Sequence, residues 1–300
     1  MASFSRSGET LLQRCLNAHP DIEVVHQIRE PDSPDDLKLF RHLIRRKEMT
    51  IPGNHPLLAH RTLSPNAVIL VKNAVWTHAH PRQGFTLARN PFSIIVSARL
   101  AYSSGLPSRF GNGTCAPSAS FTFCGAAASN GVLKIPGRIV RHAEESKTSE
   151  HQRKQQMRWC AEIDPLMMPY VQTAENLDGY LSLYSRKLLQ DFRDGLPFVR
   201  YEDFVSDPET WLRRIVAHLG IDWSDRVLKS HEDYQQGETG HGKIKLWRPI
   251  HEGSTDKYKV LSEAQRARVY ALTHEVLSNY GYGWDGEDLA LREVPGIIGG

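Results

Sequence analysis

Short apolar runs rich in β-branched residues alternate with helical patterns along much of this 300-residue chain. The runs that read as buried strands are AVILVK at 67–72, GFTLA at 84–88 and PFVRY at 197–201. Helical periodicity covers residues 10–18, 91–102, 176–192, 208–220 and 261–282. Strands that alternate with helices favour parallel βαβ units over an all-α or all-β architecture. The sequence therefore predicts an α/β fold, a single domain over residues 1–300 in which helices flank a central parallel sheet.

The charge balance argues against a dedicated nucleic-acid binder. Lys and Arg number 37 against 34 Asp and Glu, a formal net charge of +3. This small excess suits a protein that holds a small polyanion with a few well-placed cations. No apolar run approaches the roughly 20 residues of a membrane helix, and the amino terminus lacks the apolar core of a secretory signal. We therefore expect no nucleic-acid partner, no membrane span and a cytoplasmic location.

The four cysteines, at 15, 115, 124 and 160, form neither a CxxC pair nor a Cys/His cluster with metal-ligand spacing. We therefore predict no metal site. A reducing cytoplasm disfavours a bridge between the nearest pair, Cys115 and Cys124, so all four thiols are expected to be reduced.

Two irregular segments interrupt the alternating pattern. Residues 104–137 are rich in Gly, Ser, Ala and Pro and are long for a connection within a compact domain, which predicts a substrate lid or a surface loop. Residues 235–256 form a second irregular, basic segment, where binding is expected rather than core packing. Residues 283–300 are interpreted as a C-terminal tail.

The loop SRSGETLL, at 5–12, is predicted to bind an anion. A glycine turn between a strand and a helix presents consecutive backbone N–H groups, and the helix amino terminus adds positive potential. An ATP-binding P-loop ends in Gly-Lys-Ser/Thr, but here Glu9 and Thr10 follow Gly8, and the cation, Arg6, precedes the glycine. The loop thus favours a phosphate- or sulfate-bearing ligand without matching the ATP motif.

A second stretch, ARNPFSIIVS at 88–97, places Arg89 at the carboxyl end of a predicted strand and Ser97 two turns into the following helix. Ligands in open α/β sheets bind outside the carboxyl ends of the strands. We therefore expect Arg89 and the Arg6 loop to face one crevice.

Together with VRYEDF at 199–204, these stretches resemble three motifs of the sulfotransferases that use 3′-phosphoadenosine 5′-phosphosulfate (PAPS). In order, they are similar to the 5′-phosphosulfate loop, the 3′-phosphate motif and the adenine-side strand end, in the style of carbohydrate, tyrosylprotein and bacterial members. The resemblance implies a P-loop-type domain. It also implies transfer of a sulfuryl group from PAPS to a hydroxyl or amine of an acceptor, which leaves PAP and needs no metal.

The resemblance further implies the residues that bind the cofactor. Arg6 matches the cation that neutralises the bridging oxygen, and Arg89 with Ser97 matches the pair that holds the 3′-phosphate, a task for which the planar arginine fork is well suited. Tyr201 matches a tyrosine near the adenine. From the residues alone, Ser97 equally fits a hydroxyl bonded back to its own helix, and Tyr201 a core tyrosine. The full implied set is Arg6, Ser7, Gly8, Glu9, Thr10, Arg89, Ser97 and Tyr201, with Arg248 and Lys257 (beside Lys259) in the region where the family closes a loop over the nucleotide.

The catalytic base stays open between several residues. Cytosolic family members carry a Lys-x-His after a strand, but this chain has Lys72 followed by Ala74, so Lys72 is left with an electrostatic role beside Arg6. Other members use a glutamate whose ungapped position falls here on Gln27. The neighbouring candidates are His26, whose usual pKa suits a base near neutral pH, and Glu30, which would need desolvation; His78 and His80 follow.

Two departures from the motifs leave alternatives open. Glu9 either faces solvent or lowers the affinity for the anion, and the MASF that precedes the loop is shorter than a usual first strand, which suggests an upstream start or a shortened, less stable strand. The alternatives are a non-catalytic PAP-binding relative and a P-loop kinase or NTPase. The acceptor is expected to be a small molecule or a glycan, and the sequence predicts no oligomeric state.

Overall fold

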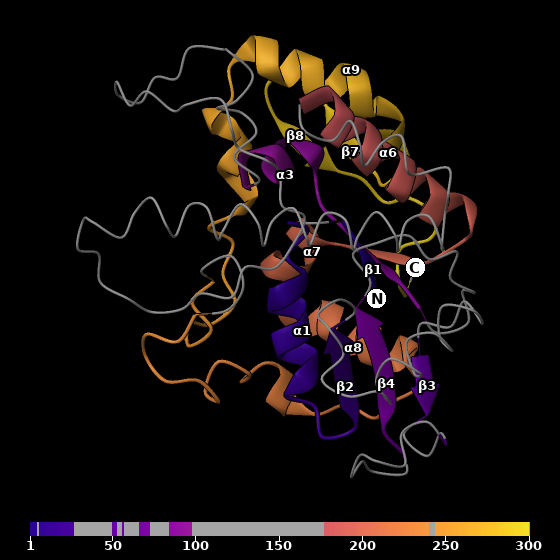
Figure 1. The fold of residues 1–300 in the computed structure, drawn as a ribbon, viewed down its shortest axis with the longest axis vertical. Coiled ribbons are helices and arrows are strands. Elements are labelled where there is room, and N and C mark those ends of the chain that lie inside the picture. Colours follow the sequence, from indigo (N-terminus) through magenta and orange to yellow (C-terminus); the bar gives the residue numbers. More distant parts are fainter. Residues whose placement is uncertain are drawn as a thin grey trace, which may run out of the picture.

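The computed structural model describes residues 1–4, 6–26, 50–52, 56, 66–72, 84–97, 177–239 and 244–299. Within these ranges, helices and mostly parallel strands confirm the α/β class (Figure 1). The described strands form two separate three-stranded sheets and a hairpin, where we expected one central sheet. The structure describes nothing of residues 104–137, Glu30, His78 or His80, and the predictions made for them lie outside the described residues.

The first sheet is parallel and carries the predicted binding motifs at its strand ends. Its order is β1 (Ala2–Ser3), β5 (Thr86–Ala88), β6 (Phe198–Arg200), with Ser3 opposite Leu87 and Ala88 opposite Arg200. Every residue of the three strands is buried, as expected of a parallel sheet that is covered on both faces. The first strand does form, with only two residues.

The second sheet has the order β2 (Ile22–His26), β4 (Val68–Lys72), β3 (Thr50–Pro52). Strands β2 and β4 are parallel, while β3 is an antiparallel edge strand, a position that tolerates Pro52. Sequence reasoning missed β2 and β3, since in this sheet it predicted only the strand at 67–72.

Five predicted helices are present in the described residues: α1 (Glu9–Asn17), α3 (Pro91–Ser97), α6 (Leu177–Arg193), α8 (Pro208–His218) and α9 (Glu263–Asn279). Their starts follow capping chemistry, because the Asp207 side chain accepts from Thr210 N, and Ser262 with Gln265 forms a capping box. A short helix that we did not predict, α7 (Tyr201–Ser206), begins directly after β6. Two 3₁₀ segments follow α8, η4 (Asp225–Val227) and η6 (Thr255–Val260).

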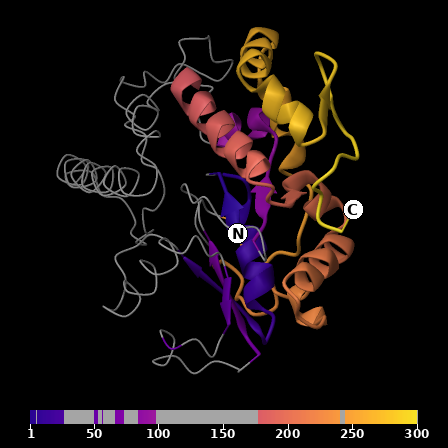
Figure 2. The same cartoon turned by 90° about the vertical axis from the view of Figure 1, so that its right-hand side faces the viewer.

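Helices pack against the sheets and against one another. Helices α6 and α9 pack side by side at one end, α1 packs on β2, and η6 packs on α3 (Figures 1 and 2). The ring of Phe4 meets Tyr180 and Tyr184 edge-on, with centroids 5.1 and 5.4 Å away. This buried contact joins the end of β1 to α6, which stabilises the start of the anion loop.

The C-terminal residues pack on the first sheet. Strands β7 (Tyr282–Trp284) and β8 (Leu289–Leu291) form an antiparallel hairpin. Further on, Phe198 N donates to Gly296 O (2.8 Å) and Ile298 N to Phe198 O (3.0 Å), and Ile297 and Ile298 are buried. The segment interpreted as a tail therefore extends the edge of β6 rather than projecting from the fold.

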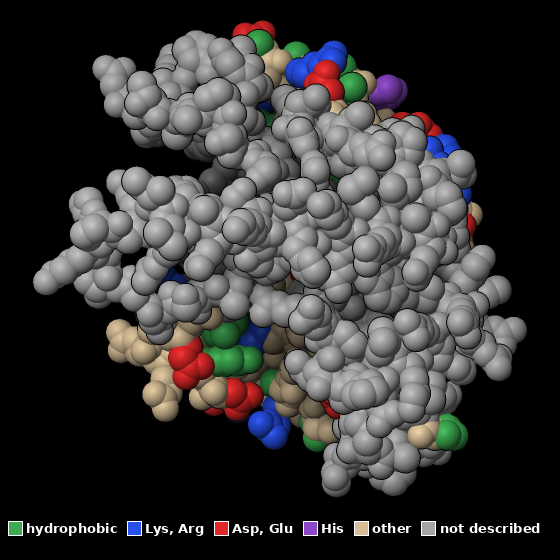
Figure 3. All heavy atoms as spheres, in the orientation of Figure 1, with side chains coloured by type: hydrophobic (Ala, Val, Ile, Leu, Met, Phe, Trp, Pro, Cys, Tyr) green, Lys and Arg blue, Asp and Glu red, His purple; other side chains and the backbone are tan. Residues whose placement is uncertain are grey.

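Among the described residues, no helix is long and apolar enough to span a membrane, and no group of His, Cys, Asp and Glu has metal-site geometry. On the face drawn in Figure 3, coloured acidic and basic side chains lie close together, in keeping with the small net charge. Cys15, whose burial raises the pKa of its thiol, is free.

Candidate anion-binding site

Three predicted motifs meet at the carboxyl edge of the first sheet. Because Ala88 lies opposite Arg200, the next residues, Arg89 and Tyr201, emerge side by side. The Arg89 guanidinium lies 4.2 Å from the centroid of the Tyr201 ring, and its Nη1 donates to Arg6 O (3.0 Å). The loop after β1 and the end of β5 therefore border a common site, as expected of ligand sites in open α/β sheets.

The loop after β1 holds an unusual backbone conformation. Gly8, just before α1, has φ 96°, and Arg6 is left-handed as well with φ 74°. A Cβ built on Gly8 would lie 2.3 Å from Tyr201 Cδ2, so the tyrosine ring closes directly over the glycine. Only glycine fits this position, and the strained Arg6 is of the kind that functional loops retain.

The Arg89 side chain is almost fully buried, with 4% of its surface exposed. Its Nη2 donates to Ser254 O (2.6 Å), so both of its bonded nitrogens face backbone carbonyls. Within the described residues, its Nε has no hydrogen-bond partner and no carboxylate lies within ion-pair distance. A buried guanidinium without a counter-charge is costly, and a bound anion would offset that cost.

Lys257, on η6, adds a third positive charge. It keeps an exposed side, yet partial burial lowers its pKa from the usual value, and the charges of Arg89 and then Arg6 lower it further. Ser93 Oγ donates to Thr255 O (3.0 Å), which ties η6 to α3. Arg6, Arg89 and Lys257, from three segments, thus share one region, which we call the cation cluster.

Two serine hydroxyls complete the site. Ser7 Oγ and Ser97 Oγ are shielded from solvent and have no hydrogen-bond partner among the described residues. The alternative in which Ser97 bonds back to its own helix is therefore wrong in this structure. Buried hydroxyls without partners are rare, and oxygen-rich anions can satisfy them.

Glu9 and Thr10 follow Gly8 in the first turn of α1. Glu9 is buried, with 5% of its surface exposed, so the alternative that it faces solvent is wrong. Thr10 is partly exposed. A buried carboxylate near the loop leaves reduced anion affinity as the remaining alternative.

The predicted catalytic residues His26 and Lys72 end β2 and β4, where they are register partners. Neighbouring strands lie roughly 4.8 Å apart, so both backbones reach the same carboxyl edge of the second sheet. The positions of their side chains lie outside what the structure describes.

Arg248 does not take part in the described contacts of the cation cluster. Its side chain is exposed, with the guanidinium 4.9 Å from the Trp247 ring, while its carbonyl accepts from Arg14 Nη1 (2.8 Å). Lys259 is paired instead with Asp256, 3.1 Å away.

The model of the Sulfotransferase family matches residues 172–225. These residues, called the sulfotransferase segment below, are similar to that family. The matched segment contains α6, β6, α7 and α8, and with them Tyr201, but it includes neither the Arg6 loop nor the Arg89 motif. The match confirms the recognition of a sulfotransferase family and supports a transferase. A comparison with curated proteins gives no match.

The sulfotransferase segment also contains site residues that sequence reasoning missed. Tyr184, on α6, donates to Arg89 O (2.8 Å), and Glu202, on α7, accepts from Asn90. The motif YEDF indicated Tyr201 but not the glutamate after it. Glu202 is only 8% exposed, and a buried acidic residue at a strand end indicates a polar network. Ser254 contributes its backbone carbonyl, so its residue type does not indicate a role in the site.

Proposed function

We propose that the chain is a PAPS-dependent sulfotransferase that transfers a sulfuryl group to a hydroxyl or amine of a small-molecule or glycan acceptor. The observation that carries the proposal is the joint occurrence of three cations at the carboxyl edge of β1, β5 and β6 with the unpartnered hydroxyls of Ser7, in the loop after β1, and Ser97, at the end of α3. Such a site demands an anion with several oxygens. The sulfotransferase segment supplies one wall of it through Tyr201.

The residues fit a nucleotide with phosphate groups at both ends. Arg89 Nε and Ser97 Oγ would hold the 3′-phosphate, while Ser7 and the backbone at the start of α1 would hold the 5′ end. Lys257 adds charge between them, and the Tyr201 ring lies on the adenine side. Gly8 lets the ring and the loop backbone approach closely.

PAPS, when bound, supplies a sulfuryl group already activated for transfer. Arg6 and Lys72 would offset the negative charge that develops as the bond from sulfur to the bridging oxygen breaks, so no metal is required. The acceptor loses a proton as its new bond to sulfur forms, and His26 or Glu30 would take that proton, an assistance worth roughly 10²–10⁴-fold in rate.

Calorimetric binding of PAP without magnesium tests the proposal. We expect micromolar binding by the wild type and a loss of about 2 kcal/mol or more in Arg89→Ala, because a charge-assisted contact to phosphate is removed. Arg213→Ala is the matched control, since Arg213 is exposed and bonds Glu209 on α8.

Three outcomes would contradict the proposal. A folded wild type that binds no PAP would mean that the motifs mark ancestry alone. Magnesium-dependent ATP turnover would favour a P-loop kinase or NTPase instead. PAP binding without sulfuryl transfer to any acceptor would point to a non-catalytic relative.

A further inference from the structure

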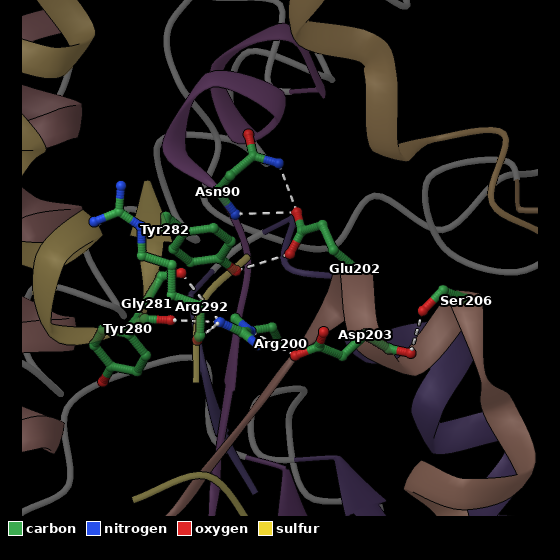
Figure 4. A network of polar contacts seen from close by, with 9 residues as sticks. All are labelled: Asn90, Arg200, Glu202, Asp203, Ser206, Tyr280, Gly281, Tyr282 and Arg292. Carbon is green, nitrogen blue, oxygen red and sulfur yellow. Dashed lines mark hydrogen bonds and ion pairs between the residues drawn. The ribbon is translucent and has the colours of Figure 1, made fainter. Parts of the chain in front are cut away.

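Glu202 borders the candidate site, and the hydrogen bonds of its carboxylate within the described residues go to none of the groups proposed to bind the nucleotide. Its carboxylate is buried in the first turn of α7, next to Tyr201 (Figure 4). Oε1 accepts from Asn90 N (3.2 Å) and from Asn90 Nδ2 (2.6 Å), and Oε2 accepts from the Tyr282 hydroxyl (2.8 Å). One carboxylate thus joins the α3 start to the C-terminal hairpin.

These contacts fix the orientation of the Asn90 amide. A carboxylate only accepts hydrogen bonds, so the Asn90 amide nitrogen must face Glu202. Asn90 Oδ1 is then free to accept from Ser93 N (2.7 Å), the N-cap interaction that starts α3. The Glu202 carboxylate therefore orients the Asn90 side chain that caps α3, and α3 carries Ser97 at its other end.

The peptide group between Arg89 and Asn90 is held from both sides. Its carbonyl accepts from the Tyr184 hydroxyl (2.8 Å), and its N–H donates to Glu202. Burial raises the pKa of Tyr184 and of Tyr282 well above the usual value, with Glu202 adding to the rise, so both phenols remain donors. Because this peptide sets the direction in which the Arg89 side chain leaves the backbone, its two partners pre-organise the guanidinium.

We infer that Glu202 is a positioning residue that makes the site selective for a 3′-phosphorylated adenine nucleotide. It acts through Asn90 by fixing Arg89 and Ser97, and Tyr282 steadies it from the C-terminal hairpin. This inference rests on the proposed function, since it assigns the 3′-phosphate to Arg89 and Ser97.

The test compares the affinities for PAP and 5′-AMP, which differ in the 3′-phosphate alone. Their ratio isolates the contribution of the 3′-phosphate, whereas a general loss of stability would weaken both nucleotides equally. Glu202→Gln keeps the shape and removes the charge, and we expect it to lower the ratio roughly tenfold while 5′-AMP binding is kept. Arg89→Ala sets the scale for complete loss of 3′-phosphate recognition.

Asp203→Asn is the matched control. Asp203 is the adjacent carboxylate on α7, and it pairs with Arg200 on the side away from Asn90 (Figure 4). This variant should lower the melting temperature and leave the ratio unchanged. If Glu202→Gln does not fold, Tyr282→Phe, which removes one hydroxyl and keeps the ring, should lower the ratio by roughly threefold.

The outcomes separate the two ideas. A folded Glu202→Gln or Tyr282→Phe with the wild-type ratio overturns the positioning role and leaves the proposed function intact. A wild type that does not prefer PAP over 5′-AMP overturns both.

Discussion

At the scale of single residues, the contact between Gly8 and Tyr201 dominates the candidate site. The ring occupies the space that any side chain at position 8 would need, and the backbone there is left-handed. The Arg89 guanidinium lies over the same ring, 4.2 Å from its centroid. A change at Gly8 should therefore reach the cation cluster through the tyrosine.

Gly8→Ala is expected to destabilise the protein more than backbone strain alone explains. The left-handed conformation costs a non-glycine residue about 1–2 kcal/mol, and the collision with Tyr201 adds about 1–3 kcal/mol of overpacking. Urea unfolding measures the total. PAP affinity should fall as well, because the displaced ring no longer supports Arg89.

Gly237→Ala is the control for strain without collision. Gly237 has φ 99°, and a Cβ built there meets nothing within 4 Å. It should lose only the strain contribution and retain PAP binding. Equal losses of stability in Gly8→Ala and Gly237→Ala would show that the Tyr201 ring moves aside without a cost in stability.

At the scale of elements, Arg14 joins α1 to the irregular segment at 244–250. Its Nη1 donates to Leu246 O (2.7 Å) and Arg248 O (2.8 Å), and the side chain is 3% exposed. These carbonyls belong to a segment in which no side chain is fully buried, and the buried arginine contributes to its attachment.

Arg14→Met is expected to loosen this segment with little effect on the global fold. Methionine fills a similar volume, but it leaves the two carbonyls without their donor, at a cost of about 1–3 kcal/mol. Trypsin should then cut faster after Lys245, as followed by mass spectrometry under native conditions. Cleavage at the wild-type rate would show that Arg14 does not hold this segment to α1.

Arg213→Met provides the comparison for this experiment. Arg213 is exposed, bonds Glu209 within α8 and lies over the Trp223 ring, 4.1 Å from its centroid. Exposed pairs contribute little to stability, so the cleavage rate after Lys245 should not change.

At the scale of the whole molecule, sequence periodicity predicted the elements with strong local signals. The helices α6, α8 and α9 and the strands β4, β5 and β6 lie where apolar spacing and caps placed them. Strand β2 was missed because IEVVH is short and contains the polar residues Glu23 and His26. Helix α7 was missed because a buried Tyr201 resembles the end of a strand. Local pattern cannot distinguish such short elements, which tertiary packing decides.

The candidate site likewise contains residues that the sequence predicted and residues that it did not. The motifs predicted Arg6 and Ser7 in one short stretch and Arg89 and Ser97 in another, so each pair has a local spacing in the sequence. Glu202, Ser254 and Tyr282 join the site through contacts between residues 80 to 165 positions apart, and each of these contacts uses a backbone atom or a buried hydroxyl. Such partners leave no periodic signal in one sequence.

The cation cluster sets the stability of the whole protein against its affinity for an anion. Lys257 has a pKa that burial, Arg89 and Arg6 lower in the folded state, so its charged form destabilises the fold. The unfolded state binds more protons between the lowered and the usual pKa, and stability should therefore rise with pH across that interval. Below it, the unfavourable contribution is present in full.

Lys257→Gln is thus expected to raise the melting temperature near neutral pH, in a buffer free of phosphate and sulfate, and to weaken PAP binding. The gain should shrink as the pH rises toward the usual pKa of lysine, because the wild type sheds the same charge. Lys259→Gln is the control: the Asp256 partner raises the pKa of Lys259, so its removal should bring no gain. A Lys257→Gln protein that melts lower than the wild type without anion, yet binds PAP as tightly, would show that Lys257 lies outside the field of Arg6 and Arg89.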